Sequence, residues 1–150
     1  MGKITGLART AASALAATAA FVTLVGVATP ANAAVTRQVH VLYEDSEGYY
    51  EVRFNGTVSH GANPLLYIID GDLDASCHHG ALTRQSAAVE FGPANKGWQK
   101  RAHWCDDTPV HIHAEGWREA GVKIRVRVGA TSGAFNTYNW GTGIEYNIDG

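Results

Sequence analysis

The chain has 150 residues, with 12 Lys and Arg against 14 Asp and Glu, which gives a formal net charge of −2. A nucleic-acid binder usually carries a basic excess that neutralises phosphates, and this composition has none. The length suits one domain, large enough to form a core and small enough to gain stability from a covalent cross-link.

Residues 1–33 have the order of a secretory signal peptide. Two basic residues come first, residues 11–28 are uncharged, and a small-residue Ala-Asn-Ala triplet follows. A membrane anchor is the alternative, because the uncharged stretch is just long enough to span a bilayer, but it is mostly Ala, Thr and Ser and is followed by Pro. We therefore expect cleavage after Ala33, one secreted extracellular domain over 34–150, and no membrane span after cleavage.

The two cysteines, Cys77 and Cys105, both fall in the predicted secreted domain. Exported proteins meet an environment that does not reduce disulfides, so we expect these cysteines to be bonded to each other. Two free thiols or a shared metal ion are the alternatives. A closed loop of this length is expected to stabilise the fold by roughly 3 to 4 kcal/mol on the chain-entropy model.

The first part of the predicted domain alternates between apolar and polar residues. Over 35–43 this alternation predicts a strand that has Val39 and Val41 on one side. Asn55-Gly56 stands between two alternating runs, and this pair is the strongest short-range signal for a hairpin. A turn is therefore predicted there.

The middle of the chain contains the predicted core strand. The apolar run 65–69 is too short for a helix and is predicted to be a strand buried on both faces. Residues 70–72, Asp-Gly-Asp, are predicted to turn the chain. Residues 82–91 permit either a helix or a strand, which Gly92-Pro93 ends.

Further strands are predicted over 98–104, 110–114, 122–128 and 136–148. In 122–128 every second residue is β-branched and the others are basic, as in a strand with one face in the core and one in water. Glycines at 141–143 predict a bulge or kink in the last region. About seven or eight short strands without an amphipathic helix predict an all-β fold, an antiparallel β-sandwich with one intradomain disulfide.

Five of the seven histidines fall within 36 residues: His78, His79, His103, His111 and His113. The predicted disulfide would bring the first two beside the third, and the last two share one face of a strand. These residues are candidate ligands for Zn or Cu. Histidines are also common on exposed strand faces, and a closed site needs three or four converging ligands, so no cofactor is the preferred expectation.

Other patterns that carry chemistry are incomplete. Residues 70–74 resemble the opening of an EF-hand calcium loop, but Ala75 and Ala81 stand where that loop requires Gly and a bidentate Glu. A nucleophile elbow, an H-E-x-x-H motif and a P-loop are all missing from the sequence. We therefore expect the protein not to be an enzyme.

Aromatic and basic residues offer a second kind of candidate surface. Lys123, Arg125 and Arg127 form a basic stripe that would suit an acidic partner or a glycan, although a solvated strand face explains it more simply. Aromatic side chains can form a sugar-stacking platform or a protein hot spot, while some of them must be core. The aromatic candidates are Trp98, Trp104, Trp117, Trp140, Tyr138 and Tyr146.

The function predicted from these features is binding of another secreted protein. A sandwich with exposed edges binds extended segments by strand addition, and the first predicted strand lies at a free end. Its residues are the candidate partner-binding set, with edge protection as the alternative role: Val35, Arg37, Val39, Val41 and Tyr43. In layout alone, the chain is similar to secreted microbial protease inhibitors and to small adaptor subunits of exported toxin assemblies, some antibacterial. A carbohydrate- or cell-surface-binding module and a histidine-cluster metal protein are the alternatives.

Overall fold

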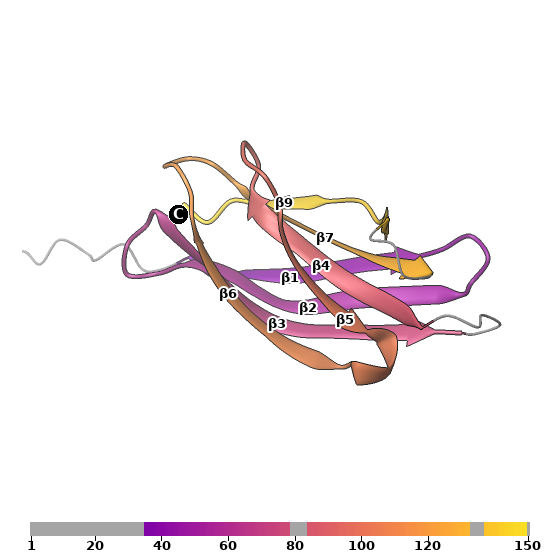
Figure 1. The fold of residues 1–150 in the computed structure, drawn as a ribbon. Coiled ribbons are helices and arrows are strands. Elements are labelled where there is room, and N and C mark those ends of the chain that lie inside the picture. The colour runs from indigo at the N-terminus through magenta and orange to yellow at the C-terminus, as the bar shows by residue number, and fades with distance from the viewer. Residues whose placement is uncertain (1–34, 79–83, 133–136, 150) are drawn as a thin grey trace, which may run out of the picture.

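The computed structural model describes residues 35–78, 84–132 and 137–149, which form a two-layered antiparallel β-sandwich (Figure 1). The predicted signal peptide, residues 1–33, lies outside these ranges. Within them, no helix has the length and apolar character needed to cross a membrane.

Two sheets make up the sandwich, and all of their strand pairs are antiparallel. Sheet A has the order β1 (Arg37–Glu44), β2 (Tyr50–His60), β3 (Leu66–Cys77), β6 (Val110–Trp117). Sheet B has the order β5 (Gln99–Trp104), β4 (Gln85–Pro93), β7 (Ile124–Ser132), β8 (Asn139–Trp140), and β9 (Ile144–Tyr146) also pairs with β7. One 3-10 turn, η1 (Cys105–Asp107), joins β5 of sheet B to β6 of sheet A.

The core lies between the two sheets and is built from alternate residues of their strands. In β1, Val39 and Val41 are buried while their neighbours are exposed, and in β7 Val126 and Val128 are buried. The alternation predicted for 35–43 and 122–128 is thereby confirmed. Burying one such side chain stabilises the fold by about 1.5 to 3 kcal/mol.

The predicted disulfide is confirmed. The Sγ atoms of Cys77 and Cys105 are bonded, and the two Cα atoms lie 6.1 Å apart. The bond joins the last residue of β3 to the first residue of η1. It therefore ties sheet A to the segment that crosses over from sheet B.

The hairpin predicted at Asn55-Gly56 is wrong, and so is the turn predicted at 70–72. Both segments lie inside long strands, where Gly56 pairs with Gly71. A Cβ added to Gly71 would lie 2.6 Å from the Cα of Gly56 and 2.8 Å from Cζ of the buried Phe54. Glycine is required at this crossing because the strands approach closely there, and not because the backbone turns.

Replacement of Gly71 by alanine is expected to lower the free energy of unfolding by about 2 kcal/mol, because the new methyl group meets backbone and a buried ring that cannot move away. Gly97→Ala is the matched control, since a Cβ there has nothing within 4 Å, and should change stability by less than about 0.5 kcal/mol. Urea denaturation of the two variants measures both values. Equal stabilities would contradict the proposed close approach.

Two further predictions about single strands are settled by burial and by position. The apolar run 65–69 is not buried on both faces: Tyr67 and Ile69 are in the core, but Leu66 and Ile68 are only half-buried because the outer face of sheet A is not covered. The ambiguous run 82–91 is described from residue 84 onward; it is a strand from residue 85, and this strand ends at Gly92-Pro93 as predicted.

Candidate functional site

The strand predicted to bind a partner, β1, directs most of its candidate residues inward. Val39 and Val41 are core residues, with exposed fractions of 0% and 3%. Val35 and Tyr43 are half-buried, and Arg37 alone is exposed. Of the candidate residues, only Arg37 is therefore fully available to a partner, together with the backbone edge of β1 and the exposed side chain of Leu42.

That backbone edge is bordered by the chain that follows β7. The Nε of Arg37 donates a hydrogen bond of 2.8 Å to the carbonyl oxygen of Asn147. A Cβ added to Gly141 would lie 3.0 Å from the carbonyl oxygen of Leu42, so the chain before β9 also approaches β1. Residues 141–147 therefore lie beside the edge to which a partner strand was predicted to add.

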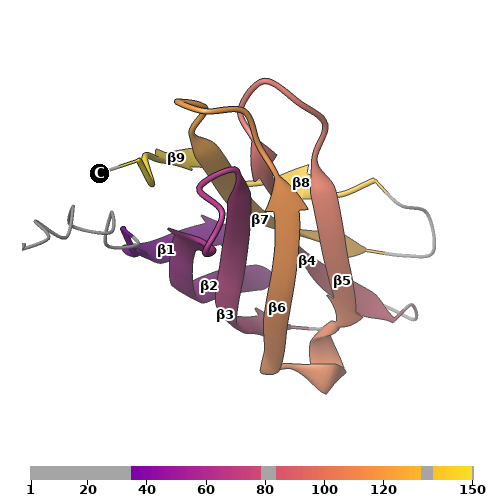
Figure 2. The same ribbon diagram turned by 90° about the vertical axis from the view of Figure 1, so that its left-hand side faces the viewer.

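The opposite edge of sheet A is formed by β6, and it is open in the sense that no strand of the described residues is hydrogen-bonded to its far side. β6 pairs with β3 along its eight residues, from Leu66–Trp117 to Leu73–Val110, and with no other strand in the described ranges. Charged residues, above all Lys, and Pro usually protect an edge strand; β6 contains no Lys, Arg or Pro and one carboxylate, Glu115. Figure 2 shows β6 between β3, its partner in sheet A, and β5, the edge strand of sheet B.

The outer face of β6 carries two histidines that pair with aspartates of β3. His111 Nδ1 lies 3.0 Å from Oδ1 of Asp72, and His113 Nδ1 lies 2.7 Å from Oδ2 of Asp70. The hydrogen bond to Asp72 raises the pKa of His111 above its ordinary value of 6.5. The hydrogen bond with His113 lowers the pKa of Asp70 below its ordinary value of 3.8. This ladder of imidazoles and carboxylates is solvent-exposed.

The thermal stability of the protein is expected to fall as pH rises from about 6 to about 8, and to fall less in His111→Gln. A raised pKa means that folding favours the protonated imidazole, so this stabilisation is complete below 6.5 and is lost as pH passes the folded value. Melting temperatures of both proteins across this range test the expectation. Parallel curves for the two proteins would contradict it.

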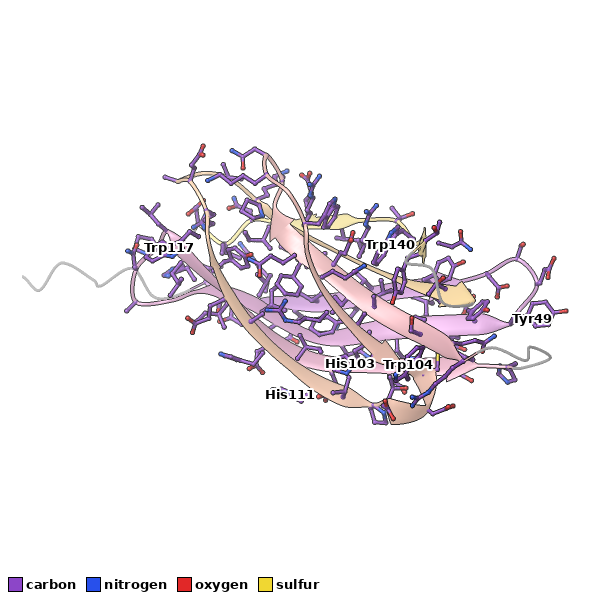
Figure 3. All side chains as sticks on the ribbon, viewed as in Figure 1. Tyr49, His103, Trp104, His111, Trp117 and Trp140 are labelled. Carbon is purple, nitrogen blue, oxygen red and sulfur yellow. A yellow bond between two sulfur atoms is a disulfide. The ribbon has the colours of Figure 1, made fainter. Side chains whose placement is uncertain are left out.

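The five histidines predicted as metal ligands are not gathered at one place by the residues that the structure describes. His79 lies outside those residues, His78 is exposed after β3, and His103 is half-buried on β5. Figure 3 shows His103 and His111 on different strands. Among described residues, no group of three or more His, Cys, Asp or Glu could hold a metal ion. The binding of Zn or Cu therefore stays a prediction, and the described residues provide no closed set of ligands for it.

The outer face of sheet B carries aromatic rings that alternate with cations. The Cζ atoms of Arg125 and Arg127 lie 3.9 and 4.3 Å from the ring centroid of Trp98. We call the continuous set the cation–aromatic face. In order of contact it consists of Arg125, Trp98, Arg127, Trp140, Tyr138 and Lys100.

The second half of this face has two stacked rings between two cations. Arg127 also lies over Trp140, 4.8 Å from the ring centroid, and the Trp140 ring stacks on Tyr138 with centroids 5.2 Å apart. The Nζ of Lys100 lies 4.8 Å from the centroid of Tyr138. Each such cation–ring contact contributes about 0.5 to 2 kcal/mol, depending on its exposure to water.

Small residues form the floor beneath these rings. Ala88 has an exposed fraction of 0% although it does not belong to the core between the sheets. A Cβ added to Gly129 would lie 2.8 Å from Cε3 of Trp140, so that ring rests directly on the β7 backbone. The rings of this face are therefore packed onto sheet B, while Lys100 at its end is exposed.

The cations of this face differ in how far their charge is neutralised. Arg127 donates from Nε and Nη2 to Oε2 of Glu90, at 3.0 and 2.7 Å. Arg125 donates from Nη2 to the carbonyl oxygen of Lys96, and its buried Nε has no hydrogen-bond partner. Within the described residues, neither Arg125 nor Lys100 takes part in an ion pair. The carboxylates opposite them in the sheet, Glu145 and Glu90, form ion pairs with Lys123 and Arg127 instead.

The remaining predicted aromatic and basic candidates lie elsewhere. Trp117 is 64% exposed at the end of β6, and Figure 3 shows it far from Trp140. Trp104 is partly exposed with Arg84 over its ring at 4.5 Å. Lys123 of the predicted stripe lies 3.5 Å from a carboxylate oxygen of Glu145. The structure therefore unites part of the aromatic set with part of the basic stripe, a combination that sequence reasoning had treated as two features.

Comparisons of the chain with protein-family models, curated proteins and solved structures yield no match.

Proposed function

We propose that this chain is an exported, non-enzymatic domain that binds another secreted protein, either as an adaptor subunit of an exported assembly or as an inhibitor. The partner contributes an extended segment that adds to sheet A at β6. The open edge of β6, eight residues in regular register with β3 and without Lys, Arg or Pro, carries this proposal.

Strand addition at β6 would supply affinity through the backbone. Each backbone hydrogen bond formed contributes about 0.5 to 1.5 kcal/mol net, and alternate side chains of the added strand supply selectivity. Trp117 lies at the end of β6 with most of its surface in water. Trp is among the residues that most often dominate binding energy, so this ring is a suitable anchor for the partner.

Export is supported by the disulfide as well as by the predicted signal peptide. The bond between Cys77 and Cys105 is typical of a protein that folds outside the reducing cytoplasm. The proposed partner is therefore another secreted protein.

The proposal is tested with His113→Lys and a matched control, Gln38→Lys. The two residues lie on opposite edge strands of sheet A, in one row across the sheet. Along this row Gln38 pairs with Thr57, Thr57 with Asp70, and Asp70 with His113. A lysine on an edge strand disfavours addition of another strand. Tagged full-length proteins are exported into the native culture medium and recovered with the proteins that they retain.

The expected result is one stoichiometric protein retained by the wild type and by Gln38→Lys, and retained about tenfold less by His113→Lys. Amide exchange should slow on binding in residues 110–117 and not in residues 37–44. Slowed exchange in β1 alone, equal retention by both variants, or retention of no protein above the untagged control would each overturn the proposal.

A further inference from the structure

We infer that the cation–aromatic face of sheet B is a binding site for an extended acidic polysaccharide. This site is separate from the β6 edge, and the inference does not rest on the proposed protein partner. It rests on how the rings hold the cations, on which cations form no ion pair, and on how charge is divided between the sheets.

Stacking on a ring fixes a guanidinium group without using its hydrogen-bond donors. The N–H groups of arginine lie in the plane of the guanidinium, whereas the ring contacts its face. Arg125 and Arg127 are held against Trp98 in this way, at 3.9 and 4.3 Å. A bound carboxylate or sulfate therefore meets donors whose conformational freedom has already been reduced, which improves affinity.

The unmet charge on this face matches an anionic ligand. Arg125 has a buried Nε without a hydrogen-bond partner, and neither Arg125 nor Lys100 has an ion-pair partner among the described residues. These cations come from β7 and β5, which are separated by β4. One small anion contacts only one of them, whereas a polymer with repeated acidic groups contacts both.

The two sheets carry opposite charge, which directs an acidic polymer to sheet B. The strands of sheet A contain six carboxylates and two cations. The strands of sheet B contain four cations and two carboxylates. A polyanion is therefore repelled from one layer and attracted to the other.

An acidic polysaccharide fits this face better than a neutral one. A neutral sugar gains affinity by stacking on a free aromatic ring, but Trp98 already has two guanidinium groups against it and Trp140 is stacked on Tyr138 and contacted by Arg127. These contacts occupy ring surface that a sugar would need for stacking, whereas Arg125 and Lys100 form no ion pair among the described residues.

The test measures binding of the full-length exported protein to heparin and to polygalacturonate by isothermal titration at several salt concentrations. Lys100→Gln and Arg125→Gln each remove one charge from the face. Arg53→Gln is the matched control, because it removes one exposed charge from sheet A. Each face variant is expected to bind at least one acidic polymer about five times more weakly than the control. The slope of the logarithm of its binding constant against the logarithm of salt concentration should correspond to about one released ion fewer.

Melting temperatures within a few degrees of the wild type would show that the variants fold. Equal affinities of the face variants and the control would overturn the inference, as would equal binding to neutral dextran. Tighter binding to polyglutamate than to either polysaccharide would also overturn it, since the site would then recognise an acidic protein segment. Lys100→Gln should still retain the protein partner proposed for β6, because Lys100 lies on sheet B. The two proposals can therefore fail independently.

Discussion

Replacing both Cys77 and Cys105 with alanine is expected to lower the free energy of unfolding by about 3 to 4 kcal/mol. The bond closes a loop with a sequence separation of 28 residues, and without it the unfolded chain gains the corresponding conformational freedom. The loop contains all of β4 and β5. The bond therefore restrains the part of the chain that leaves sheet A after β3, forms two strands of sheet B and returns to sheet A at β6. For a domain of this size, such a loss is a large part of the total stability.

Urea denaturation of the double variant and of the oxidised and reduced wild type measures this contribution. The reduced wild type should unfold at the midpoint of the double variant, because both lack the cross-link. A double variant within about 0.5 kcal/mol of the oxidised wild type would show that the bond does not stabilise the fold, in contradiction to the chain-entropy argument.

Strand periodicity could be read from the sequence wherever a strand has one buried face. The alternation in β7 and the position of Val39 and Val41 in β1 follow directly from a period of two. Asn55-Gly56 failed as a turn signal because the requirement for glycine there comes from Gly71 on the neighbouring strand. Close approach between strands depends on register, which local sequence does not contain.

The candidate surfaces were less predictable because each is assembled from separate segments. The cation–aromatic face combines residues 98–100, 125–127 and 138–140, and only the pairing of β4 and β7 with their neighbours brings them together. The sequence named the tryptophans and the two arginines but gave no reason to include Lys100. Likewise, the topology decides which strands lie at an edge. It leaves β6 without a second hydrogen-bonded strand and places the segment around Asn147 beside β1.

A buried arginine after β6 joins three separate parts of the chain. The side chain of Arg118 has an exposed fraction of 0% and forms a two-pronged ion pair with Asp149, in which Nη1 lies 2.8 Å from Oδ2. It also donates to the carbonyl oxygens of Pro64 and Val122, at 2.8 and 3.1 Å. The connections β2–β3 and β6–β7 and the segment after β9 are thus held by one guanidinium group.

Arg118→Met is expected to lower the free energy of unfolding by about 3 kcal/mol. The variant removes the guanidinium donors from the Asp149 carboxylate and from two carbonyl oxygens, and methionine fills part of the space. Among the described residues, the Asp149 carboxylate keeps only the hydrogen bond from the backbone N–H of Gly121, at 3.1 Å. This loss of stability is at the low end of what breaking a buried ion pair costs, because the Asp149 side chain is 37% exposed and stays partly hydrated. Lys96→Met is the control: it breaks an exposed pair with Glu119, at 3.2 Å, and should lower stability by at most about 1 kcal/mol.

The difference between wild type and Arg118→Met should itself depend on pH. The hydrogen bond with Arg118 lowers the pKa of Asp149 below its ordinary value of 3.8. A lowered pKa means that folding favours the carboxylate, so this stabilisation is present above 3.8 and is lost as pH falls through the folded value. The difference in the free energy of unfolding between the two proteins, measured by urea denaturation, should be constant from about pH 7 to about pH 5. It should become smaller below about pH 4. A difference that stays unchanged at acid pH would assign the effect of Arg118 to its packing and its carbonyl contacts instead of to the ion pair.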